Sequence, residues 1–132
     1  DTSFERTLGS ERVSKSFPWR SLDEAGAVLA FSSDWNVVDM NPLPGIQAAV
    51  ARDWGSGASQ AVSLEKAIEA YTLNGAYASF EEDIKGSIEE GKLADFVILS
   101  ENLFEIEPER IGDVEVLMTV IGGREAHLSG RL

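Results

Sequence analysis

Apolar and polar positions in the first part of the chain predict one unit of an α/β fold. Residues 21–25 can form a short helix capped by Ser21, and Gly26 suits a left-handed cap at its C-terminal end. The apolar run 27–33 follows and predicts a strand buried on both faces, as in a parallel sheet. A helix, a tight turn and an apolar strand in this order are typical of α/β architecture.

Two further helices are expected before residue 80. Residues 46–54 place apolar side chains on one side of a helix: Ile46, Ala49, Val50 and Trp54. Residues 55–59, "GSGAS", then read as a flexible break. Ser63 can cap a longer helix over 64–80, with Glu65 favourably placed in its first turn and apolar residues at near-3.6 spacing, namely Leu64, Ala67, Ile68, Tyr71, Ala76 and Tyr77.

The remainder of the chain reads as β structure. Strands are expected at 86–88 and 95–99, and residues 115–128 predict a hairpin whose two-residue turn is Gly122-Gly123. The sequence therefore predicts an α/β portion over 1–80 and a β portion over 81–132.

Composition excludes several classes of function. The 132 residues include 11 basic and 23 acidic side chains, and the resulting net charge of −12 argues against nucleic-acid or anionic-membrane partners. No cysteine is present, which excludes disulfides, thiolate metal sites and a cysteine nucleophile and fits a reducing, cytoplasmic location. No stretch approaches the roughly 20 apolar residues that a membrane-spanning helix needs.

One carboxylate remains as a candidate for a catalytic or metal-binding side chain. His127 is the single histidine, so a zinc site built on several histidines cannot come from this chain alone, and no nucleophile elbow or phosphate-binding glycine motif occurs. Asp34 directly follows the predicted strand 27–33, where functional groups gather in parallel α/β folds. It could bind a metal or accept a proton, or it could form an Asx turn or a helix cap. Position alone leaves these alternatives open.

Four motifs in order resemble the C-terminal region of the amidohydrolase superfamily of metal-dependent hydrolases. "KGSIEEGKLADFVILS" at 85–100 resembles the closing signature of that superfamily. "FPWRSLDEAGAVLAFSSDW" at 17–35 is similar to the last α/β step of the barrel in the amidohydrolase-family-3 branch, which holds N-substituted formamide deformylases and exoenzyme regulatory protein homologues. The segments 63–80 and 114–127 resemble the following helix and the final hairpin, so the resemblance covers about residues 12–128.

The resemblance implies a fold and a site. The fold would be the last βα units of a (β/α)8 barrel followed by the C-terminal strands of a small β-sandwich. Asp34 matches the Asp at the end of the eighth barrel strand, which implies a metal ligand and general base beside one or two divalent metals, usually zinc. Trp35 would line the substrate pocket or pack under the loop. Asn36 and Asn41-Pro42 depart from the branch pattern and leave the loop conformation and substrate preference open.

Two functions follow as expectations. The first is a C-terminal fragment of a metal-dependent hydrolase that acts on carbon–nitrogen bonds, other than peptide bonds, of a small amide-like substrate. Such a fragment alone is expected to be inactive and to hold no metal of its own. The second is a non-catalytic binding or assembly module. It would form a homo-oligomer because apolar residues would otherwise face missing neighbours: Leu29, Phe31, Val97 and Ile98.

Overall fold

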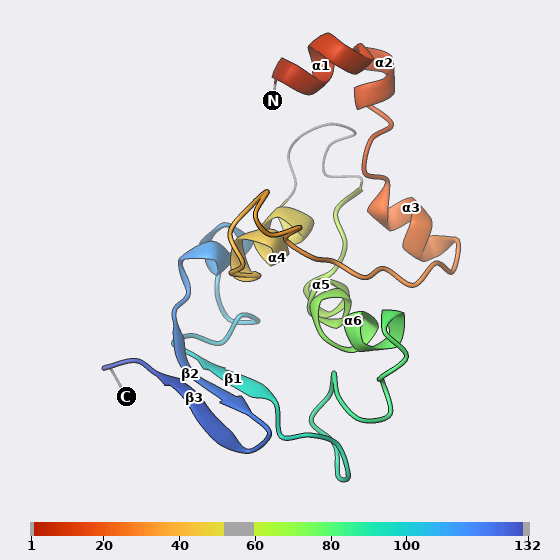
Figure 1. Ribbon diagram of the computed structural model, residues 1–132. Helices are drawn as coiled ribbons and strands as arrows, with labels where there is room; N and C mark the ends of the chain where they lie inside the picture. The colour runs from red at the N-terminus through yellow and green to blue at the C-terminus, as the bar shows by residue number, and fades with distance from the viewer. Residues whose placement is uncertain (1, 52–59, 131–132) are drawn as a thin grey trace.

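A computed structural model of the protein describes residues 2–51 and 60–130, with side chains described from residue 5 onward (Figure 1). Helices and one short sheet follow each other along the chain. Their bounds are α1 Thr2–Leu8, α2 Ser10–Val13, α3 Trp19–Glu24, α4 Leu43–Val50, α5 Leu64–Tyr71, α6 Leu73–Ala78, β1 Phe96–Leu99, the 3₁₀ helix η2 Pro108–Asp113, β2 Val116–Ile121 and β3 Arg124–Leu128.

Helix α3 confirms the predicted helix and its glycine cap but not the predicted start. The helix begins at Trp19, directly after Pro18, so Ser21 lies inside it and is not its N-cap. The reason is local, because the proline ring fixes φ ahead of the first turn. Gly26 has φ +86° and ends the helix as expected. The N–H groups of Gly26 and Ala27 donate to carbonyls of the last turn at 2.9 and 3.0 Å, which is the Schellman arrangement.

The expectation of a strand buried on both faces over 27–33 is wrong. The segment runs past helix α5 without a strand partner in the described part of the chain (Figure 1). Its side chains alternate in exposure: Leu29 and Phe31 are half-buried against the core, whereas Val28 and Ala30 are exposed. A strand becomes buried on both faces only when other elements cover both, and the described residues cover one.

Helix α4 begins three residues earlier than expected. The side chain of Asn41 accepts a hydrogen bond from the N–H of Leu43 at 3.0 Å, and Pro44 lies in the first turn, where a missing N–H costs nothing. The helix ends at Val50. Trp54 and the expected break at 55–59 lie outside the described residues.

The single helix expected over 64–80 is two helices, α5 and α6. Ser63 caps α5 as predicted, since its hydroxyl accepts from the N–H of Lys66 at 3.3 Å. Hydrogen bonds from its own backbone N–H and from Ser63 hold the pKa of Glu65 below the ordinary value for a glutamate. The chain breaks at Thr72, which has φ −124° and ψ −90° and whose hydroxyl donates to the carbonyl of Ile68 at 2.8 Å.

The β portion forms one antiparallel sheet in the order β1-β2-β3. The predicted hairpin is confirmed, with φ +56° at Gly122 and +75° at Gly123 in its turn. The strand expected at 86–88 is wrong. Gly86 has φ +94°, and a Cβ added there would lie 2.8 Å from the Cβ of Ala76, so this loop packs directly on α6 instead of extending.

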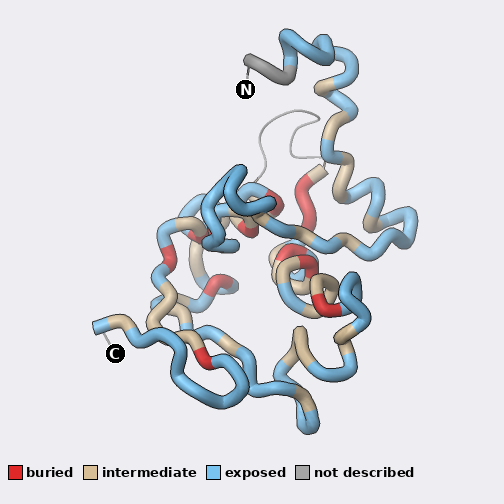
Figure 2. The backbone as a smooth tube through the Cα atoms, viewed as in Figure 1, coloured by how far each residue is buried: buried red, intermediate tan, exposed pale blue. Residues whose placement is uncertain are grey.

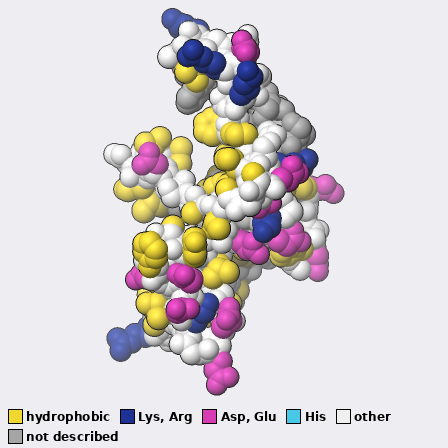
Figure 3. All heavy atoms as spheres, turned by 90° about the vertical axis from the view of Figure 1, so that its right-hand side faces the viewer, with side chains coloured by type: hydrophobic (Ala, Val, Ile, Leu, Met, Phe, Trp, Pro, Cys, Tyr) yellow, Lys and Arg dark blue, Asp and Glu magenta, His cyan; other side chains and the backbone are white. Residues whose placement is uncertain are grey.

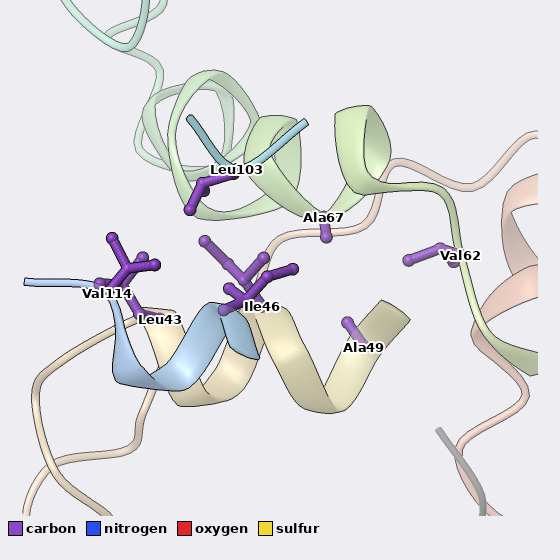
Figure 4. Packing of buried hydrophobic residues seen from close by; sticks show 8 residues of the cluster. Leu43, Ile46, Ala49, Val62, Ala67, Leu103 and Val114 are labelled. Carbon is purple, nitrogen blue, oxygen red and sulfur yellow. The ribbon is translucent and has the colours of Figure 1, made fainter. Parts of the chain in front are cut away.

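The buried residues gather where α4, α5 and η2 meet (Figures 2 and 4). Both sides of residue 80 contribute to this core cluster, which consists of Leu43, Ile46, Ala49, Val62, Ala67, Leu103, Ile111 and Val114. Leu29 and Phe31 pack against it, so the expectation that they face missing neighbours is wrong. Val97 and Ile98 are 52% and 39% exposed, as expected. Other apolar side chains also lie on the surface in Figure 3. The division of the chain at residue 80 remains a prediction.

Phe80 offers a direct test of the α6 C-terminus. It occupies the position after the C-cap with φ +59°, its N–H donates to the carbonyl of Tyr77 at 3.0 Å, and its side chain is 91% exposed. Replacing Phe80 by Gly should raise the free energy of unfolding by about 1 kcal/mol, because glycine adopts this conformation without steric cost. Urea denaturation measures the change. Phe104→Gly, at an exposed site without a positive φ, should be neutral or destabilising, and equal gains in both variants would refute the explanation.

Candidate active site

Asp34 lies at the first position of a turn over residues 34–37. Its φ is +49°, a left-handed conformation that aspartate tolerates better than most residues. Its carbonyl accepts the N–H of Val37 at 2.8 Å, and its own N–H donates to the hydroxyl of Ser32 at 3.3 Å. The backbone of Asp34 is thus engaged on both sides of the residue.

The carboxylate of Asp34 is exposed, and no described residue hydrogen-bonds or pairs with it. Other side chains in this loop accept hydrogen bonds from its backbone. Asp39 accepts the N–H of Asn41 at 2.8 Å, and Asn41 in turn accepts the N–H of Leu43 at the start of α4. Both contacts join a side-chain oxygen to the N–H two residues on, which is the Asx-turn contact that Asp34 could have made. Asp34 therefore presents, at the end of the segment 27–33, a carboxylate that has no partner among the described residues.

Trp35 follows on the same turn and is 64% exposed. A side chain so open to solvent does not pack under the loop, which was one of its two expected roles. Its other role, lining a substrate pocket, remains a prediction.

The segment that leads to Asp34 is held by the junction between α5 and α6. The N–H of Phe31 donates to the carbonyl of Ala70 at 2.9 Å, and the side-chain amide of Asn74 donates to the carbonyl of Leu29 at 3.0 Å. Sequence reasoning missed Asn74 because it treated 64–80 as one helix. The Asn-Gly pair at 74–75 does not mark the interruption, because both residues lie inside α6 and the chain breaks earlier, at Thr72.

Two aromatic rings hold the side chain of Phe31, which belongs to the same segment. The ring of Phe31 lies between Trp19 and Tyr71, with centroid separations of 5.2 and 5.7 Å. Burial raises the pKa of the Tyr71 hydroxyl. A side chain at Gly45 would overlap that hydroxyl, so glycine is needed for the close approach of α4 to Tyr71.

His127 lies elsewhere in the molecule. It shares a cross-strand row with Thr119 and Val97, and these three side chains border a largely apolar cavity of about 930 Å³ between the sheet and helices α4 and α5. Within residues 2–51 and 60–130, no three His, Cys, Asp or Glu side chains come together in a way that could hold a metal ion. The described residues therefore do not form a metal site on their own.

Comparison with known proteins gives the class of fold first. An amidohydrolase crystal structure from Thermotoga maritima MSB8 superimposes with a TM-score of 0.66 over 83% of this chain and 25% of that one, at 23% sequence identity. The helices and the small three-stranded antiparallel sheet thus fit a part of the amidohydrolase fold.

The sequence comparisons then give the family. Protein LONG AFTER FAR-RED 3 of Arabidopsis thaliana is 40% identical over 95% of this chain and 22% of its own length. The N-substituted formamide deformylase of Arthrobacter pascens is 33% identical over 83% of this chain and 21% of its own length. The profile described as "Amidohydrolase family" matches residues 1–127. The chain belongs to the amidohydrolase family.

The chain spans about a fifth to a quarter of the length of these relatives. In the part of the chain that the structure describes, no helix is both long and apolar enough to cross a membrane.

Proposed function

We propose that this chain is the C-terminal part of a hydrolase that cleaves carbon–nitrogen bonds, other than peptide bonds, in small amide-like substrates. Two observations support this. The family match extends over residues 1–127, and a relative that is 33% identical is named for removing a formyl group from N-substituted formamides. Within this chain, the proposal rests on the carboxylate of Asp34. Asp34 has a left-handed conformation, and its carboxylate makes no hydrogen bond or ion pair with a described residue.

Asp34 is the side chain to which we assign the chemistry. An exposed carboxylate that caps no helix and pairs with no described cation can accept a proton from a water molecule attacking a carbonyl carbon. The family is generally metal-dependent, and zinc is the metal that the resemblance implies. Because the described residues bring no second or third ligand to Asp34, such an ion would have to take its other ligands from outside them.

The proposal is tested by comparing the 132-residue chain with the complete product of the reading frame that contains it. A panel of N-formyl amines, N-acyl amines and cyclic amides serves as substrates. The complete protein should hydrolyse at least one of them, whereas the chain alone should hydrolyse none and should bind zinc weakly in equilibrium dialysis. Tight, stoichiometric zinc binding together with turnover by the chain alone would contradict the proposed division of the site. A complete protein that is inactive on the whole panel would contradict the proposed reaction.

A second candidate is a non-catalytic binding or assembly module that forms a homo-oligomer. The observation in its favour is apolar exposure: Phe80 and Ile88 are 91% and 84% exposed, and both faces of β1 carry partly exposed apolar side chains. Strand β3 is also an open edge of the described sheet. Sedimentation equilibrium of the chain at micromolar concentration should then show a dimer or larger species. A folded monomer would count against this function.

A further inference from the structure

We infer that Asn74 is a positioning residue that sets the location of the Asp34 carboxylate. It acts through the backbone of the segment 29–31 and does not touch the reacting atoms. This inference rests on the proposed role of Asp34. It is carried by the two hydrogen bonds that tie residues 28–33 to another element in the described structure, one from Asn74 and one to Ala70.

These two hydrogen bonds lie on one edge of the segment. In an extended chain the polar groups of residues i and i+2 point to the same side, so the carbonyl of Leu29 and the N–H of Phe31 share an edge. The carbonyl of Leu29 accepts from Asn74 at 3.0 Å, and the N–H of Phe31 donates to the carbonyl of Ala70 at 2.9 Å. The α5–α6 junction therefore supplies one donor and one acceptor where a neighbouring strand would otherwise supply them.

The break at Thr72 makes this pairing possible. In a continuous helix the carbonyl of Ala70 would accept the backbone N–H of Asn74, four residues on. Instead the chain turns at Thr72, α6 begins at Leu73, and the carbonyl of Ala70 accepts from Phe31. The same break places Asn74 in the first turn of α6, from which its side chain reaches Leu29.

Helix α6 is itself held from another direction. A Cβ built on Gly86 would lie 2.8 Å from the Cβ of Ala76 and 2.9 Å from the Cα of Leu73, so the 84–88 loop sits directly on α6. On the side of the segment, the ring of Phe31 is enclosed by Trp19 and Tyr71. The α5–α6 junction therefore holds the segment in place. Near the end of the segment, the hydroxyl of Ser32 accepts the N–H of Asp34.

The decisive substitution is Asn74→Asp, which keeps the shape of the side chain but replaces its N–H donor with an oxygen facing the Leu29 carbonyl. In the complete hydrolase we expect kcat to fall about 10- to 100-fold with KM within about threefold, because a small displacement of a reacting group lowers the rate without removing substrate contacts. Asn74→Ala removes the donor without adding charge and should act in the same direction. Asn74→Gln retains an amide donor and should recover part of the loss.

A matched control is Asn102→Asp. The side chain of Asn102 accepts the N–H of Phe104 at 3.1 Å, and aspartate preserves that acceptor, so kcat should stay at the wild-type value. A second readout does not depend on activity. Hydrogen exchange of peptides covering residues 28–33, followed by mass spectrometry, should become at least about tenfold faster in the Asn74→Asp and Asn74→Ala variants, while exchange in α5 should be unchanged.

The outcomes separate this inference from the proposed function. If Asp34→Asn is inactive while Asn74→Asp and Asn74→Ala keep the wild-type kcat, the positioning role is refuted and the proposed function stands. If exchange in 28–33 does not change in either Asn74 variant, the hydrogen-bonding basis of the inference is refuted. If Asp34→Asn remains active, the proposed role of Asp34 fails, and with it the positioning role of Asn74, whatever the exchange rates show. Should Asn74→Asp fail to fold, Asn74→Ala carries both measurements.

Discussion

The Asp34→Asn variant of the complete hydrolase is expected to lose about 10³-fold in kcat. General acid–base groups typically contribute about 10²- to 10⁴-fold, and asparagine, although similar in shape, cannot accept a proton. Asparagine also tolerates φ +49°, so the turn over residues 34–37 should keep its conformation. The measurement is steady-state turnover on whichever amide-like substrate the complete protein hydrolyses.

Asp39→Asn provides the matched control for this loss. Asp39 lies in the same loop and is exposed, but its carboxylate accepts the N–H of Asn41 at 2.8 Å, and an asparagine carbonyl can accept the same hydrogen bond. The same chemical change at this site should leave kcat within about twofold of wild type, as expected for a surface change that preserves its contact. Equal losses at both sites would mean that negative charge in the loop matters in general, and Asp34 would lose its special role.

Local signals in the sequence predicted the elements that depend on local chemistry. The Gly122-Gly123 pair specifies a two-residue hairpin turn because both positions need positive φ, and the strands on either side pair as expected. The same holds for the cap of Ser63 on α5 and the left-handed end of α3 at Gly26. In each case a few neighbouring residues decide the conformation.

Apart from the helix starts at α3 and α4, the errors occurred where contacts distant in sequence decide the conformation. Segment 27–33 has the composition of a doubly buried strand, but burial depends on neighbours that the described residues do not supply. The helix expected over 64–80 breaks at Thr72, where the carbonyl of Ala70 bonds to Phe31 instead of to its own helix. Gly86 lies against α6 and cannot extend as a strand. Hydrophobic periodicity does not report such contacts.

The sequence singled out Asp34 as a candidate, but the alternative roles of its carboxylate could not be separated there. Asp34 stood out by its place after an apolar run and by its match to a family motif. Whether its carboxylate formed an Asx turn depended on which side chains in the loop made such contacts. In the structure Asp39 and Asn41 make them, and residue types do not show this in advance, because all three side chains are able to form an Asx turn.

Substitution of Ile111 by Ala should produce the largest loss of stability among the changes considered for this chain. Ile111 lies in η2, is 1% exposed, and packs in the core cluster with Leu43 and Ile46 of α4. Removing three carbons from such a site leaves a cavity and should lower the free energy of unfolding by about 2–5 kcal/mol. Urea denaturation of the 132-residue chain, followed by tryptophan fluorescence, measures the change.

Ile121→Ala is the matched control because it removes the same atoms from a side chain that is 60% exposed at the end of β2. Its cost should stay below about 1 kcal/mol. A much larger loss of unfolding free energy in Ile111→Ala than in Ile121→Ala would show that the packing of η2 on α4 stabilises the fold. These two helices come from opposite sides of residue 80. The N–H of Gly112 also joins these elements by donating to the side chain of Gln47 at 2.7 Å. Equal costs would mean that η2 contributes little to the core, and the loop that carries Asp34 would then lack firm support at its α4 end.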